Sequence, residues 1–115
     1  MKLTFNQALQ QATQYQQNRD FGRAEELYRL ILAENPNSVN ANRLLGLLYQ
    51  QTGKQDQAKP LLLKAISLKP DFAESHRNLG NVYLTTGELK KAAPCFQTAI
   101  QLEPGSADAH KQLGN

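Results

Sequence analysis

The side chains with the strongest chemical character recur at a fixed spacing of 34 residues. Arg43, Arg77 and Lys111 form such a line of cations. Guanidinium groups pair with carboxylates through two parallel hydrogen bonds, so these cations would suit an acidic peptide segment or a C-terminal carboxylate. Alternatively, they are solvated surface cations, some of them paired with Glu74 or Asp108. The sequence leaves both interpretations open.

Amide side chains accompany the cations at Asn78, Asn81 and Gln112. An amide can donate and accept hydrogen bonds at once, which suits the main chain of a bound peptide whatever its side chains. Leu44 and Leu47 replace amides in the preceding segment. They predict either an apolar subsite beside the first cation or packing against a neighbouring helix.

The sequence offers little for catalysis or metal binding. We find no nucleophile elbow, phosphate-binding loop or metalloprotease motif, and Cys95, the single cysteine, has no base placed beside it. One cysteine excludes an internal disulfide and a thiolate zinc site, and it favours a reducing compartment. His76 and His110 share the spacing of 34, but we expect them to be packing residues. We therefore expect a non-enzymatic chain without catalytic residues, cofactor or metal.

Composition narrows the class of protein further. The chain has 115 residues, of which 40% are hydrophobic and 20% charged, with a net charge of +3. These values are typical of a single water-soluble domain, and no apolar run approaches the roughly 18 residues that span a bilayer. Residues 1–17 lack the apolar stretch of a secretion signal, so we expect a cytoplasmic protein. Glutamates and asparagines interrupt the basic positions, which makes nucleic acid a poor candidate partner.

The spacing of the chemical groups comes from an internal repeat. Pro36, Pro70 and Pro104 lie 34 residues apart, and aligning residues 39–72 with 73–106 gives identical residues at twelve positions. Residues 5–38 form a degenerate first unit, in which Arg19 stands where the later units have glycine. Residues 107–115 begin a fourth unit. We expect one domain, 1–115, built from these units.

Apolar residues recur at helical spacing twice in each unit, which predicts two helices per unit. Gly53 and Gly87 fall where a left-handed residue would end the first helix. Thr4 with Gln7, and Asp71 with Glu74, have the spacing of reciprocal N-terminal caps. The expected helices cover residues 5–18, 21–34, 39–52, 55–68, 73–86, 89–102 and 107–115.

Small and large residues at fixed places predict close helix packing. Gly46 and Gly80 would let helices approach, beside the larger side chains of Tyr49, Tyr83 and Phe96. This pattern, Leu-Gly-x-x-Tyr followed by Gly, Ala, a large apolar residue, Ala and Pro, resembles the tetratricopeptide repeat. The resemblance implies an all-α, right-handed superhelical α-solenoid of antiparallel helix pairs, with three units plus a partial fourth. It also implies that the first helix of each unit lines the concave side.

Repeat positions 2, 5, 6, 9, 12 and 13 would then line the groove. The expected lining is Asn6, Leu9, Gln10, Thr13, Gln16 and Gln17, then Asn40, Arg43, Leu44, Leu47, Gln50 and Gln51, then Glu74, Arg77, Asn78, Asn81, Leu84 and Thr85, and finally Asp108, Lys111, Gln112 and Asn115. Among these we expect Arg43, Leu44, Leu47, Arg77, Asn78, Asn81, Lys111 and Gln112 to bind a peptide.

Three functions fit this pattern. The first is a protein-protein interaction scaffold that binds a peptide or partner protein, with a preference for acidic segments, in its groove. The units are also similar to those of O-linked N-acetylglucosamine transferase superhelices, which suggests an N-terminal substrate-recruiting arm of a larger transferase. The third is self-association through an uncapped C-terminal end near Leu113, because solenoids usually end in a polar capping element.

Overall fold

The chain folds into helices joined by short turns, and the computed structural model describes residues 3–104. Within them lie α1 (Phe5–Gln17), α2 (Phe21–Glu34), α3 (Val39–Gln51), α4 (Gln55–Leu68), α5 (Ala73–Thr85) and α6 (Leu89–Leu102). Each bound agrees with the sequence-based prediction to within one residue. The expected helix at 107–115, with Lys111, Gln112 and the self-association site near Leu113, lies outside the described residues.

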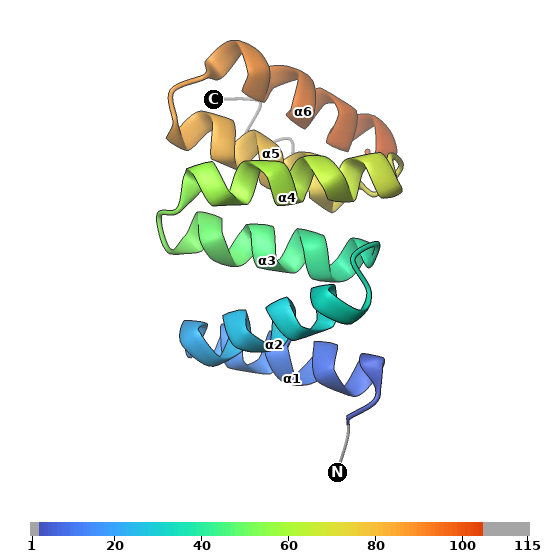
Figure 1. The fold of residues 1–115 in the computed structure, drawn as a ribbon. Helices are drawn as coiled ribbons and strands as arrows, with labels where there is room; N and C mark the ends of the chain where they lie inside the picture. The colour runs from blue at the N-terminus through green and yellow to red at the C-terminus, as the bar shows by residue number, and fades with distance from the viewer. Residues whose placement is uncertain (1–2, 105–115) are drawn as a thin grey trace.

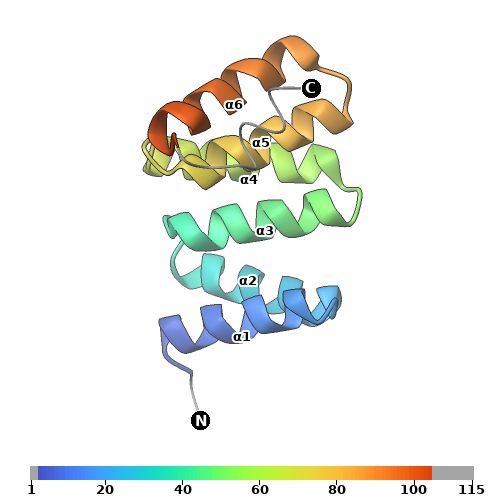
Figure 2. The same cartoon turned by 180° about the vertical axis from the view of Figure 1, so that it is seen from behind.

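The helices form antiparallel pairs that stack along one axis. Each helix contacts the next in the chain, and α3 also contacts both α1 and α5. In Figure 1, α1 and α2 lie at one end of the stack and α6 at the other. Figure 2 shows the opposite side, where α1, α3 and α5 follow one another. The all-α solenoid of helix pairs is confirmed, and its first helices share one surface. In the described part of the chain, none of the helices has the length and apolar character needed to span a membrane.

The first helix of every pair ends at a left-handed residue. Gly53 and Gly87 have φ angles of +82° and +80°, as their spacing predicted. Arg19 takes the same place in the first unit with φ of +63°. A side chain makes this conformation costly, so the turn after α1 is strained where the later turns are relaxed.

One of the two predicted helix caps is confirmed. The Thr4 side chain accepts a hydrogen bond from the Gln7 backbone N–H (3.1 Å), and the Gln7 side chain accepts one from the Thr4 N–H (2.9 Å). The cap predicted from Asp71 and Glu74 is wrong, because α5 begins after Phe72 without a side-chain cap. The Glu74 carboxylate is paired instead with an arginine of α3.

Within each pair, a small residue of the first helix faces a large residue of the second. An ideal Cβ on Gly46 would lie 2.8 Å from Cγ of Leu62, and one on Gly80 would lie 2.8 Å from the Phe96 ring. The glycines therefore make room for a side chain of the partner helix. Leu62 and Phe96 occupy the same repeat position and are almost fully buried. This contact repeats at 34 residues and fixes the pose of each pair.

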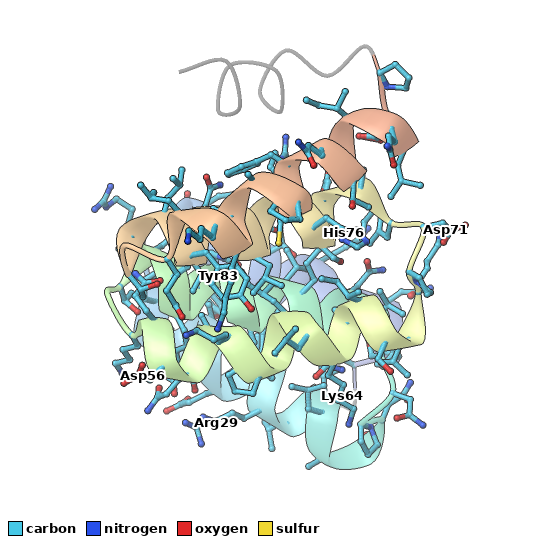
Figure 3. The ribbon with its side chains drawn as sticks, turned by 90° about the horizontal axis from the view of Figure 1, so that it is seen from above. Arg29, Asp56, Lys64, Asp71, His76 and Tyr83 are labelled. Carbon is cyan, nitrogen blue, oxygen red and sulfur yellow. The ribbon has the colours of Figure 1, made fainter. Side chains whose placement is uncertain are left out.

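A cluster of charges joins α4 to the start of α6. The Glu88 carboxylate accepts hydrogen bonds from the Thr86 hydroxyl (2.7 Å), Lys59 Nζ (3.0 Å) and Lys91 Nζ (3.3 Å). These donors lower the pKa of Glu88 to about 2. Both lysines also lie over the ring of Tyr83, between α4 and α6 (Figure 3). The cluster links the second unit to the third.

Candidate functional site

An open groove of about 550 Å³ lies between α1 and α3. Because both are first helices of their units, the groove belongs to the surface that the repeat register predicted. Its lining is Leu9, Gln10, Thr13, Gln14, Gln17, Asn40, Arg43 and Leu44. All of these except Gln14 were expected from repeat position. Gln14 follows Gln10 by one helical turn, so the i, i+4 rule could have identified it.

The rim of the groove consists of amide side chains. Gln10, Gln14, Gln17 and Asn40 are exposed. Among residues 3–104, none of these four side chains has a hydrogen-bond partner. Their N–H and C=O groups are therefore available to a ligand that offers both acceptors and donors, as an extended peptide backbone does.

The floor of the groove is apolar. Leu9 and Leu44 are half-buried and pack against the main core, each with one side turned to the groove. Thr13, between them, donates its hydroxyl hydrogen bond to the Leu9 carbonyl (2.8 Å), which leaves its methyl group to line the wall. An apolar side chain can thus lie on the floor while the rim amides bind the main chain beside it.

Gln16 was expected in the groove but is buried. Tyr28 donates a hydrogen bond to Gln16 Oε1 (2.7 Å), and Gln16 Nε2 donates one to Gln51 Oε1 (2.9 Å). Burial raises the pKa of the Tyr28 hydroxyl. The prediction failed because Tyr28 stands where Leu62 and Phe96 stand in later units, and its buried hydroxyl needs a partner. Gln16 supplies that partner and joins α1 to α2 and α3.

Arg43 lies at the end of the groove in a nearly closed environment. Its guanidinium binds Glu74 at 3.1 Å, donates to Asn78 Oδ1 at 3.4 Å, and lies 5.1 Å above the Phe72 ring centre. Its side chain is only 12% exposed, and its Nε is buried without a hydrogen-bond partner. Burial lowers the pKa of Arg43, an effect that Glu74 opposes. The predicted alternative of pairing with Glu74 describes this contact correctly.

Arg77 of α5 lies on the other side of the same carboxylate. Its Nη2 is 3.9 Å from Glu74 Oε1, and its side chain is 25% exposed. Arg43 and Arg77 therefore lie on one surface of the stack, with Glu74 between them. Their role in peptide binding stays a prediction, as does that of Lys111 and Gln112 outside the described residues.

The remaining predicted site residues differ in accessibility. Asn78 is 6% exposed, and its oxygen is turned to Arg43. Asn81 is half-buried, as is Leu47, which does not line the groove between α1 and α3. Leu44 fulfils both of its predicted alternatives, since it packs on the core and lines the groove. The structure thus brings Leu44 and Arg43 together at the groove, with Asn78 behind them.

His76 and Cys95 are occupied within the fold. His76 Nε2 lies 2.7 Å from the Pro70 carbonyl on α5 (Figure 3), and Asn42 at the same repeat position donates to the Pro36 carbonyl at 3.0 Å. Cys95 packs against the core, and burial raises the pKa of its thiol. Across residues 3–104, no three His, Cys, Asp or Glu side chains come together as metal ligands would.

Sequence families match along most of the chain. Models described as tetratricopeptide repeat match residues 9–58 and 73–106, and one described as TPR repeat matches residues 51–87. Together these matches run from residue 9 to residue 106. Comparison with curated proteins gave no significant match.

Several solved structures share the fold. An O-GlcNAc transferase mutant from Thermobaculum terrenum is 30% identical with a TM-score of 0.92, over 98% of this chain and 22% of the transferase. A crystal structure of MamA is 24% identical with a TM-score of 0.89, over 96% of this chain and 65% of MamA. The second TPR domain of human RPAP3, in complex with the HSP70 peptide SGPTIEEVD, is 21% identical with a TM-score of 0.86, over 93% of this chain and 89% of that domain. The chain thus spans about a fifth of the transferase.

Proposed function

Because the chain belongs to the tetratricopeptide repeat family, we propose that it is a protein-interaction scaffold whose groove binds an extended segment of a partner protein. The observation that carries this proposal is the open groove between α1 and α3, with unbonded amides along its rim and leucines on its floor. Since function resides in a site and not in a fold, the groove supports the proposal more than the family does.

The chemistry of the groove defines the class of segment. Gln10, Gln14 and Asn40 would bind the backbone, which makes the main chain extended and its side chains largely free to vary. An apolar side chain would lie on Leu9 and Leu44. The segment would then reach Arg43, where an acidic side chain finds a cation held in place by the fold.

A preference for acidic segments has two supports. Arg43 and Arg77 share a single carboxylate, so the cluster has more positive than negative charge. The TPR domains of RPAP3 among the similar structures hold the HSP90 peptide SRMEEVD and the HSP70 peptide SGPTIEEVD, both of which contain acidic residues. Within this proposal the chain acts in the cytoplasm, binds without catalysing a reaction and needs no cofactor.

The test begins with peptides selected from a random phage-displayed library against the folded chain. The groove variant combines Gln10→Ala, Gln14→Ala and Asn40→Ala. A matched control combines Gln57→Ala, Gln97→Ala and Gln101→Ala, which removes as many exposed amides from the second helices α4 and α6.

The two triple variants should behave differently in calorimetric titrations. Each lost hydrogen bond is worth about 0.5–1.5 kcal/mol, so the groove variant should bind its selected peptides at least about tenfold more weakly. The control should bind as the wild type does. Selected peptides that bind both variants equally well would refute the groove as the binding site.

A second candidate function rests on the 30% identity to the Thermobaculum transferase, which extends over 98% of this chain. In this alternative the groove recruits protein substrates to a catalytic domain encoded in the same reading frame. Sequencing the gene past the codon for Asn115 tests it. A glycosyltransferase-like domain in frame would support the alternative, and a stop codon directly after Asn115 would exclude it.

A further inference from the structure

Two groove cations are already bridged by a carboxylate of the chain itself. Glu74 lies 3.1 Å from Arg43 through Oε2 and 3.9 Å from Arg77 through Oε1. Its side chain is 40% exposed, compared with 12% for Arg43 and 25% for Arg77. The carboxylate is therefore the outermost member of the cluster and lies between the arginines and solvent.

The fold does not require an acid at this position. Glu74 occupies repeat position 2, where the earlier units have the neutral residues Asn6 and Asn40. It does not cap α5 in the manner its spacing predicted. Arg43 is also held by the Phe72 ring and the Asn78 oxygen, which do not depend on Glu74. The contact thus satisfies a charge without building the helix pair.

We propose that Glu74 is a built-in competitor, which occupies the place of a partner's carboxylate and must swing into solvent when an acidic segment binds to Arg43 and Arg77. The inference rests on the function proposed above and adds a specificity rule to it. A single partner carboxylate would merely exchange one ion pair for another. Segments with several acidic residues would gain by contacting both arginines and the remaining positive charge.

The structure makes this exchange inexpensive. Because Glu74 is partly exposed, its carboxylate can be hydrated after a small rotation of its side chain. Arg43 stays in place, since its aliphatic chain is buried and its guanidinium keeps the Asn78 oxygen and the Phe72 ring. The incoming carboxylate therefore meets a cation that is already oriented.

The variant Glu74→Gln tests the proposal, because it keeps the shape and one acceptor oxygen but removes the charge. Glu26→Gln is the matched control. Glu26 is exposed on α2, has no interaction with another described residue, and its replacement changes the net charge by the same amount. The probe is an octapeptide of alternating alanine and glutamate, and its neutral counterpart has glutamine in place of glutamate. Binding is measured by calorimetry at low ionic strength, with thermal melts to confirm folding.

We expect Glu74→Gln to bind the acidic probe about fivefold more tightly than the wild type, the scale of one partly exposed ion pair. Glu26→Gln should change the affinity by less than about twofold, and the neutral probe should not distinguish the variants. Unchanged or weaker binding by Glu74→Gln would overturn the proposal and assign Glu74 a positioning role. Equal tightening by Glu26→Gln would overturn it in favour of a general charge effect.

The same titrations separate this inference from the proposed function. If the wild type binds the acidic probe, and Arg43→Ala with Arg77→Ala abolishes binding, the acidic preference holds whatever Glu74 does. If only Glu74→Gln binds the probe, the competitor role is supported and the acidic preference of the wild-type groove is refuted. If neither protein binds the probe, both ideas are refuted.

Discussion

Replacing Gly80 with alanine should destabilise the fold, although alanine is the better helix former. Gly80 lies within α5, and a Cβ there would be 2.8 Å from Cε1 and Cζ of Phe96. Ordinary van der Waals contact begins near 3.4 Å, so the ring must retreat by the difference, 3.4 − 2.8 = 0.6 Å. Phe96 is 2% exposed and has little free space into which it can move.

The expected magnitude follows from two opposing terms. Overpacking of this kind costs about 1–3 kcal/mol, and the gain in helix propensity from glycine to alanine is about 1 kcal/mol. We therefore expect Gly80→Ala to lower the free energy of unfolding by about 1 kcal/mol. Gly22→Ala is the control, because Gly22 is exposed near the start of α2 and a Cβ there meets nothing within 4 Å. That variant should be more stable than wild type by about 0.5–1 kcal/mol.

Urea unfolding followed by circular dichroism distinguishes the two variants. The midpoint should fall for Gly80→Ala and rise for Gly22→Ala, at an unchanged m-value. Gly46→Ala should follow Gly80→Ala, because its Cβ would meet Cγ of Leu62 at 2.8 Å. Equal stabilisation of all three variants would refute the small-to-large contact as the feature that fixes each helix pair.

Three further changes test individual features of the fold. Arg19→Gly should raise the melting temperature, because relief of the left-handed strain at φ +63° outweighs the entropy cost of glycine by about 0.5–1 kcal/mol. Ser75→Ala should raise the free energy of unfolding by about 1 kcal/mol in urea melts, since the Ser75 hydroxyl is buried without a partner and the preceding unit has Ala41 there. Glu88 contributes stability above its ordinary pKa near 4.5 that is lost as pH falls toward about 2, so Glu88→Gln should lower stability at pH 7 and flatten the stability profile between these values. A wild-type melting temperature that does not change between pH 4.5 and 2 would contradict the last prediction.

The helices could be predicted from the sequence because the 34-residue period repeats the same physical signals. The prolines end second helices, and Gly53 and Gly87 end first helices at positive φ. Their spacing places each helix end to within one residue. The same register predicted most of the groove, since Leu9, Gln10 and Leu44 reach it through repeat position alone.

Side-chain partners could not be predicted from the same register. Glu74 has the spacing of a helix cap, but its carboxylate gains more from two arginines than from one backbone N–H. Gln16 has the spacing of a groove residue, but it is buried to satisfy the hydroxyl of Tyr28. In both cases a neighbour from another helix decides the outcome, and the period of a single helix contains no information about that neighbour.

The most direct test of the account is a map of backbone amide chemical shifts in the folded chain, recorded by NMR as a selected peptide is added. The account predicts that the largest shifts lie along α1 and α3, at Gln10, Gln14, Asn40 and Arg43, and extend to Glu74 for acidic peptides. Shifts confined to α2, α4 and α6 would contradict the proposal that the shared surface of the first helices binds the partner.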